Sequence, residues 1–229
     1  MFKPFVNRFT DSLRGIDSGC EYLLSAVVNG SEPWPEDLKP MFEGLNVEFR
    51  KYEGRGFDIG SFQFFAEQCP DPCFMVCCVT RVYSWLPGWL KKLSDARTEN
   101  GPGLYATSMS MEGGKIHVCT RCYGMDSEDF KKYPVKIVSR DQGTFFEVYD
   151  GSLFEWYARR NMPVVLVNAT ACVSFIGEHP PCYIWTRPNI YRSGNQSQVI
   201  VWDKHTDAYR DADDNRKREL ERWCFTGRA

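Results

Sequence analysis

Residues 47–79 read VEFRKYEGRGFDIGSFQFFAEQCPDPCFMVCCV, and they carry the strongest indication of the fold class. Residues 47–52 alternate between apolar and polar side chains as a half-buried strand does, and residues 74–79 form a short apolar run typical of a buried strand. Between them, a glycine-rich turn leads into residues 58–67, whose apolar residues gather on one side of a helix. A strand, a helix and another strand in this order predict an α/β fold with a mainly parallel sheet.

The same alternation continues on both sides of this stretch. The remaining helices are expected at residues 5–13, 33–42, 89–97, 127–133 and 153–161. The remaining strands are expected at residues 22–28, 104–109 and 163–167. No linker rich in Pro, Gly or Ser and no internal repeat interrupts the chain. We therefore expect one domain over residues 1–229, with a charged helical tail from about residue 203.

Composition excludes several classes of protein. The 229 residues include 28 Lys and Arg against 30 Asp and Glu, for a net charge of −2, which argues against duplex nucleic acid as the main partner. The longest strongly apolar run is too short to cross a bilayer, and the chain does not open like a signal peptide. These features favour a cytoplasmic protein, with peripheral attachment to a membrane left open.

Ten cysteines raise the question of disulfides or zinc. Disulfide-dense scaffolds are usually short and secreted, so reduced thiols are the preferred interpretation. His117, Cys119 and Cys122 have a spacing that suits zinc, with Cys69 and Cys73 as the other close pair. A structural zinc site needs four ligands, and a zinc-stabilised interaction domain is kept as the less favoured hypothesis.

Polar residues cluster directly after the predicted strands, where an open parallel sheet binds its ligands. They are Asn29, Arg55, Asp58, Thr80 and Arg81. Gly54 and Gly56 allow the backbone to approach a nucleotide closely, and the Asp58 carboxylate can accept a hydrogen bond from a ribose hydroxyl. The alternative is that the glycines only turn the chain and that Asp58 caps the following helix.

Three segments in order resemble the GT-A glycosyltransferases, particularly short bacterial and viral members related to capsule and rhamnan synthesis. They are the strand ending at Asn29-Gly30-Ser31, the segment from Tyr52 to Ser61, and the run Met75–Tyr83 with Pro87–Leu90 and Gly101–Leu104. The resemblance covers roughly residues 5–205. It implies a Rossmann-like, mostly parallel central sheet flanked by helices, a nucleoside-diphosphate sugar as donor, and a glycan, polysaccharide or lipid-linked acceptor.

The chain departs from this family where most members carry Asp-x-Asp to hold a divalent cation. Val79-Thr80-Arg81 stands there instead. Carboxylates that hold Mg²⁺ or Mn²⁺ are thus missing from this position, and Arg81 can neutralise a diphosphate directly. The sequence therefore gives no firm prediction of a cofactor. A bound Mn²⁺ or Mg²⁺ ion is the alternative that it leaves open.

Residues 146–153 resemble the acidic segment of the family that supplies the catalytic base. The resemblance implies that Glu147 or Asp150 takes a proton from the acceptor hydroxyl during an inverting transfer. A purely structural role for Asp150, as a cap of the next helix, is the competing interpretation.

Further residues are implied for the acceptor or diphosphate side. The segment His117–Tyr123 resembles a family segment that borders the acceptor, which makes His117 and Arg121 candidates. A later segment with Gln196, Lys204 and His205 resembles one that closes over the diphosphate. The structural alternatives are a hydrogen-bonding His117 and a solvated start to the charged tail.

The resemblance thus implies a hexosyl- or deoxyhexosyltransferase that uses a nucleotide sugar. The alternative is a catalytically inactive relative that binds glycans or serves as a scaffold.

Overall fold

The computed structural model describes residues 3–30, 38–84, 86–110, 115–170, 172–175 and 198–226. The helices are α1 (Lys3–Gly15), α2 (Phe57–Gln68), α3 (Trp89–Asn100), α4 (Ser127–Lys132), α5 (Arg140–Glu147), α6 (Leu153–Arg159), α7 (Lys204–Arg210) and α8 (Asp214–Thr226), with a 3₁₀ turn η1 (Lys39–Phe42). The strands are β1 (Leu24–Asn29), β2 (Val47–Tyr52), β3 (Phe74–Cys78), β4 (Val82–Ser84), β5 (Leu104–Ala106), β6 (Met109–Ser110), β7 (His117–Val118), β8 (Cys122–Asp126), β9 (Val164–Val167), β10 (Cys172–Phe175) and β11 (Val201–Asp203).

The largest sheet has five strands in the order β10-β9-β5-β8-β3. β5 and β9 are parallel, β8 is antiparallel to both of its neighbours, and β10 is antiparallel to β9. β3, β5 and β9 therefore run in one direction, and their carboxyl ends lie at the same edge. β1 and β2 form a separate parallel pair, and β4 pairs with β11.

The molecule is a mixed α/β protein, as the sequence predicts, but its main sheet in the described chain is not mostly parallel. The physical reason is β8, which inserts between β3 and β5 in the opposite direction. Residues 122–126 carry no alternation of apolar and polar side chains, because the strand is buried on both faces and its first four residues are all buried. Periodicity therefore gives no signal for it.

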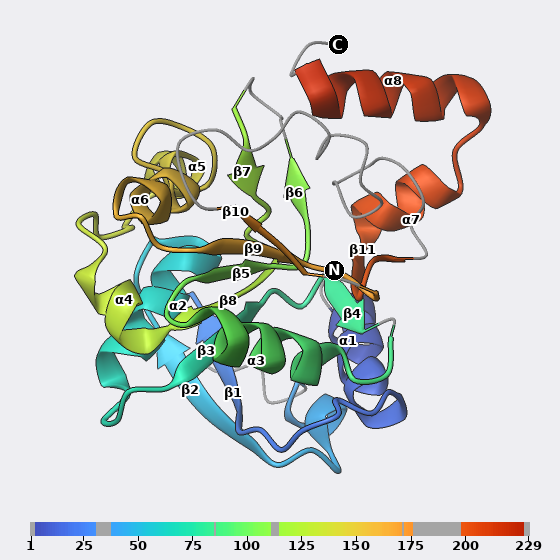
Figure 1. Cartoon of the computed structure of the whole chain (residues 1–229). Coiled ribbons are helices and arrows are strands. Elements are labelled where there is room, and N and C mark those ends of the chain that lie inside the picture. The colour runs from blue at the N-terminus through green and yellow to red at the C-terminus, as the bar shows by residue number, and fades with distance from the viewer. Residues whose placement is uncertain are drawn as a thin grey trace.

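Helices cover both faces of this sheet (Figure 1). The pleat sends Val164 and Leu166 of β9 toward one face and Val165 and Val167 toward the other. On the first face they join residues of α2, α4, α5 and α6, and on the second they join residues of α1 and α3. The architecture is thus three layers with the sheet in the middle.

Two glycines bound α3 and position the chain at both of its ends. Gly88 precedes the helix with a φ of 75°, and Gly101 follows it with a φ of 82°. Residues with a side chain rarely adopt this left-handed region, so glycine is required at both turns. The buried α3 residues Leu93 and Ala96 then pack on the sheet.

The charged tail forms two helices, α7 and α8, as expected for the segment from residue 203. Within the described ranges, no helix combines the length and the apolar character needed to cross a bilayer.

Candidate functional site

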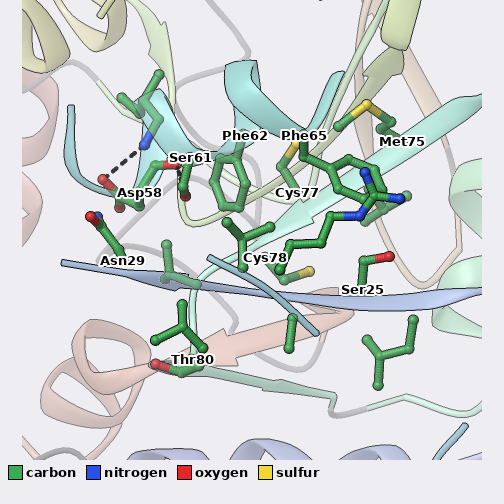
Figure 2. Close-up of a pocket in the computed structure, with 18 of the residues that line it drawn as sticks. Ser25, Asn29, Asp58, Ser61, Phe62, Phe65, Met75, Cys77, Cys78 and Thr80 are labelled. Carbon is green, nitrogen blue, oxygen red and sulfur yellow. Dashed lines mark hydrogen bonds between the residues drawn. The ribbon is translucent and has the colours of Figure 1, made fainter. Parts of the chain in front are cut away.

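A cavity of about 2400 Å³ is lined by β1, α2, β3 and the turn that follows β3. Figure 2 shows its two kinds of lining, with Asn29, Asp58 and Thr80 at one end and Phe65 and Met75 toward the other. Eight of the residues proposed from sequence line it: Asn29, Gly54, Arg55, Asp58, Thr80, Arg81, Arg121 and Glu147. These eight residues therefore share the lining of one cavity.

Asp58 lies in the first turn of α2, whose N-cap is Gly56 rather than Asp58. The interpretation of Asp58 as the helix cap is therefore wrong. Its Oδ1 accepts a hydrogen bond from the next backbone amide at 3.1 Å. Although its side chain is accessible from the cavity, partial burial raises the pKa of Asp58, the charge of Glu147 raises it further, and the charge of Arg81 lowers it. Both charged groups thus act on Asp58 inside the cavity.

Two hydrogen bonds of the Gln63 side chain hold α2 in this position. The side-chain amide of Gln63 donates to the carbonyl of Val135 at 2.9 Å and accepts from the amide of Ile137 at 2.8 Å. Gln63 is buried, so these bonds satisfy polar groups that water does not reach. These bonds join α2 to residues 135–137, and this attachment fixes the position of Asp58 at the cavity.

Close packing surrounds the two glycines before α2. A Cβ atom on Gly54 would meet the ring of Tyr52 at 2.2 Å, and one on Gly56 would meet the carbonyl oxygen of Ile137 at 1.9 Å. The space beside both residues is filled by the protein itself. These contacts account for both glycines by packing, so a close approach of the backbone to a nucleotide is not needed to explain them.

Thr80 and Arg81 form the turn between β3 and β4. The amide of Val82 closes this turn on the carbonyl of Val79 at 3.1 Å, and both turn residues line the cavity. Arg81 is exposed, and its guanidinium lies 6.0 Å from the ring centre of Phe5. An exposed cation at the carboxyl end of β3 can meet an anionic ligand.

Glu147 and Asp150 are separated by the end of α5. Glu147 is the last residue of this helix, is half-buried, and accepts a hydrogen bond from the amide of Thr120 at its Oε1, at 3.1 Å. Asp150 follows the helix, is exposed, and pairs with Lys115. Because the helix stops between them, the two carboxylates do not share a helical face. The cap of α6 is Ser152, not Asp150.

Buried aromatic rings fix the end of α5. Phe146 is fully buried and packs its ring against Phe130 at 5.8 Å and Tyr133 at 5.0 Å between ring centres. Because Phe146 is anchored in the core, the neighbouring Glu147 is held at the cavity wall.

His117 is buried in β7, and one ring nitrogen, Nδ1, lies 2.9 Å from the carbonyl oxygen of Lys115. Burial lowers its pKa, the backbone contact and Glu147 raise it, and Arg121 lowers it. His117 is not among the residues that line the cavity. The structural interpretation of a hydrogen-bonded histidine therefore fits its surroundings better than direct contact with a sugar.

Arg121 lines the cavity, and its Nη1 lies 2.8 Å from Oδ2 of Asp203. Lys204 and His205 begin α7 directly after Asp203 and are not among the cavity residues. Gln196 lies outside the described residues. The later segment thus reaches this region through Asp203 rather than through the two basic residues.

Arg140 and Thr120 also line the cavity and were not predicted. Arg140 opens α5, whose N-cap Ser139 accepts from the amide of Gln142 while the Gln142 side chain accepts from the amide of Val138. Ser-x-x-Gln is a known signal for a helix start, and it could have located Arg140. Thr120 contributes its backbone amide to the cavity wall by donating to Glu147, and a pattern of side chains in the sequence cannot predict a backbone contact of this kind.

The residues present do not fit a carboxylate-held cation at the turn after β3. Thr80 and Arg81 supply no carboxylate there, and no group of three His, Cys, Asp or Glu in the described parts of the chain could hold a metal ion. Within those parts, Cys119 and Cys122 likewise belong to no such group.

No protein-family model, curated protein or solved structure matches this chain. The chemistry of the cavity thus stands as the basis for function.

Proposed function

We propose that this protein is a nucleotide-sugar-dependent glycosyltransferase that inverts the anomeric centre and carries a GT-A-like fold. The observation that carries the proposal is the convergence of Glu147 with three arginines, Arg81, Arg121 and Arg140, on one cavity. Arg140 and Glu147 stand at the two ends of α5, while Arg81 and Arg121 come from separate turns, and the four residues unite a carboxylate base with cations suited to a diphosphate.

Glu147 serves as the base. Its Oε1 is occupied by the Thr120 amide, while Oε2 accepts no hydrogen bond from the described residues. A carboxylate held by one oxygen keeps the other for an acceptor hydroxyl, and it takes the proton as that hydroxyl attacks the anomeric carbon. The bond from that carbon to the diphosphate breaks in the same step, so no covalent enzyme intermediate is needed.

The arginines stabilise the departing nucleoside diphosphate. Guanidinium groups match phosphate oxygens with paired hydrogen bonds and keep their charge at every relevant pH. Positive charge placed where negative charge develops is usually the largest single contribution to such a reaction. Arg81 supports this role because it is exposed at the end of β3 and its charge acts on Asp58.

The direction of the strands supports the same location. β3, β5 and β9 run in one direction, and the cavity includes residues at the carboxyl end of β3. Open α/β sheets bind ligands beyond the carboxyl ends of their strands, where loops converge. Asn29 and Asp58, at the polar end of the cavity, are placed to meet ribose or sugar hydroxyls.

A thermal-shift panel of UDP-, GDP- and dTDP-sugars, each with and without Mn²⁺, tests the proposal. A ligand at about 100 times its dissociation constant stabilises the fold by about 2.7 kcal/mol, which is easily measured. Arg81→Ala should reduce the shift given by nucleoside diphosphates more than that given by nucleosides. Arg159→Ala is the matched control, because Arg159 is exposed on α6 and pairs with Glu155.

The proposal fails if no nucleotide sugar shifts the melting temperature, or if both arginine variants behave alike. Binding without release of nucleoside diphosphate in the presence of acceptors would instead support the non-catalytic glycan-binding alternative. Full activity in EDTA would agree with charge neutralisation by arginine, and loss of activity that Mn²⁺ restores would contradict it.

A further inference from the structure

Asp203 uses its two carboxylate oxygens for two different purposes. Oδ1 accepts from the amides of His205 and Thr206, at 2.7 and 3.0 Å, and caps α7. Oδ2 lies 2.8 Å from Nη1 of Arg121, which lines the proposed active-site cavity. The start of a C-terminal helix and a cation of the site are thus joined through one carboxylate.

The backbone brings Asp203 to this place. β11 pairs with β4 so that Asp203 lies opposite Val82, the residue after Arg81. The amide of Val79 donates to the carbonyl of Arg121 at 3.0 Å, which sets Arg121 beside the same turn. Asp203 therefore stands next to the turn that carries Arg81 and contacts Arg121 directly.

Capping alone does not account for this arrangement. A cap needs one acceptor oxygen, and asparagine serves as well as aspartate there. Asp203 is 6% exposed, and burial of an ion pair is a poor source of stability because both charges lose water. What the charged pair adds is a close ion contact, 2.8 Å from Nη1 of Arg121 to Oδ2 of Asp203, which restricts where the long Arg121 side chain lies.

We infer that Asp203 is a positioning residue that holds Arg121 in the orientation needed to bind the diphosphate in the cavity. The inference rests on the proposed function for its ligand, although the orientation itself can be measured without any ligand. Asp203 touches no reacting atom in this scheme and acts only through Arg121.

The test compares Asp203→Asn with Thr206→Ala. Asparagine keeps the cap and removes the charge that holds Arg121. Thr206→Ala breaks the reciprocal bond from the Asp203 amide to Thr206 Oγ1, at 2.7 Å, and leaves the contact with Arg121. The second variant thus weakens the helix start alone and serves as the control for a merely structural role.

The pKa of His117, followed by NMR, reports on Arg121 without ligand. The groups that act on this ring are the Lys115 carbonyl, Glu147 and Arg121, and Arg121 lowers its pKa. Releasing Arg121 in Asp203→Asn should therefore raise the pKa of His117, as Arg121→Gln does, while Thr206→Ala should leave it unchanged. Loss of the negative Asp203 charge by itself would lower that pKa, so the sign separates the two effects.

Affinity for UDP or GDP gives the second measurement. Asp203→Asn and Arg121→Gln should each weaken binding at least about tenfold, and the double variant should bind no more weakly than Arg121→Gln alone. An unchanged or lowered His117 pKa in Asp203→Asn, or additive losses in the double variant, would overturn the inference. If the wild-type protein binds none of UDP, GDP and dTDP, the proposed function fails, whereas the His117 measurement still decides whether Asp203 orients Arg121.

Discussion

The two ends of β8 both carry charged residues, but they use them differently. At its carboxyl end, Asp126 does not line the cavity and accepts from Nε and Nη2 of Arg97 at 2.9 and 2.7 Å, a paired contact. At its amino end, the cavity end, Arg121 pairs with Asp203, and Glu147 and Asp58 face the cavity that Arg121 also lines.

The difference separates charges that hold the fold from charges placed for a ligand. The Arg97–Asp126 pair joins α3 to β8 and completes its own hydrogen bonding. Asp58, in contrast, has a pKa raised by burial and by Glu147, which means that its charged form is disfavoured in the folded state. Groups held in such a state are often functional, because a ligand can supply the missing interaction.

The sharpest test of the cavity end is Glu147→Gln. The amide keeps the shape of the side chain but cannot take a proton, so kcat for sugar transfer should fall by roughly 100- to 10,000-fold. Donor affinity should hardly change, and steady-state kinetics separate the two parameters. Asp150→Asn is the control, since Asp150 is exposed and pairs with Lys115 away from the cavity. Wild-type turnover in folded Glu147→Gln would remove Glu147 as the base.

Gly56→Ala tests whether a cavity residue can be purely structural. Its Cβ would lie 1.9 Å from the carbonyl oxygen of Ile137, so the free energy of unfolding should fall by about 3 kcal/mol. Gly143→Ala is the matched control, because its Cβ would meet only Ile59, at 3.7 Å, and alanine favours the helix by about 0.5–1 kcal/mol. Urea unfolding measures both. A loss of nucleotide affinity in Gly56→Ala without loss of stability would restore the ligand-approach role.

Asp126→Asn tests the carboxyl end of β8, whose Asp126 does not line the cavity. It removes the charge that Arg97 pairs with, and the free energy of unfolding should fall by about 1–2 kcal/mol in urea. Asp95 lies on α3, the helix that also carries Arg97. Asp95→Asn breaks only an exposed pair with Lys91, so the free energy of unfolding should fall by about 0.3–0.5 kcal/mol. Nucleotide affinity should stay unchanged in both. If Asp126→Asn weakens nucleotide binding, the division between the two ends of β8 is wrong.

Asp58→Asn should change the free energy of unfolding by the smallest amount, and it should raise that free energy instead of lowering it. A carboxyl whose pKa is raised by folding gives stability that is full at low pH and is lost as pH rises through its folded-state pKa. Asparagine does not ionise, so the variant should gain stability over the wild type as pH rises from about 3 to about 8. Chemical unfolding across this range measures the gain. If the difference in stability between the variant and the wild type did not change with pH, the raised pKa of Asp58 in the folded protein would be contradicted.

Local patterns predicted most of the elements around the cavity. The strand at residues 47–52 is confirmed with the same bounds, and the helix expected at 58–67 is observed as α2. Both carry a periodic pattern that depends only on near neighbours in the chain. β8 and α5 were missed, because a strand buried on both faces shows no alternation and the cap of α5 was overlooked.

The residues of the site likewise divide into those that local patterns predict and those that depend on distant contacts. Asn29, Asp58, Thr80 and Arg81 were proposed because each follows a predicted strand, and all four line the cavity. The choice between Glu147 and Asp150 stayed open, since it depends on where α5 ends and on the amide of Thr120. Asp203 was assigned to the charged tail, because nothing near it in the chain shows that its carboxylate reaches Arg121.

The mixed α/β class, the elements at residues 47–52 and 58–67, and the charged groups that follow the strands can be inferred from the sequence alone. These features depend on propensity and periodicity over a few residues, which are local. In contrast, the position of β8 between β3 and β5, the placement of Glu147 rather than Asp150 at the cavity, and the pairing of Asp203 with Arg121 are visible only in the folded chain. Each depends on contacts between distant segments, because those contacts are set by the order of strands and by the burial of polar groups that must find partners.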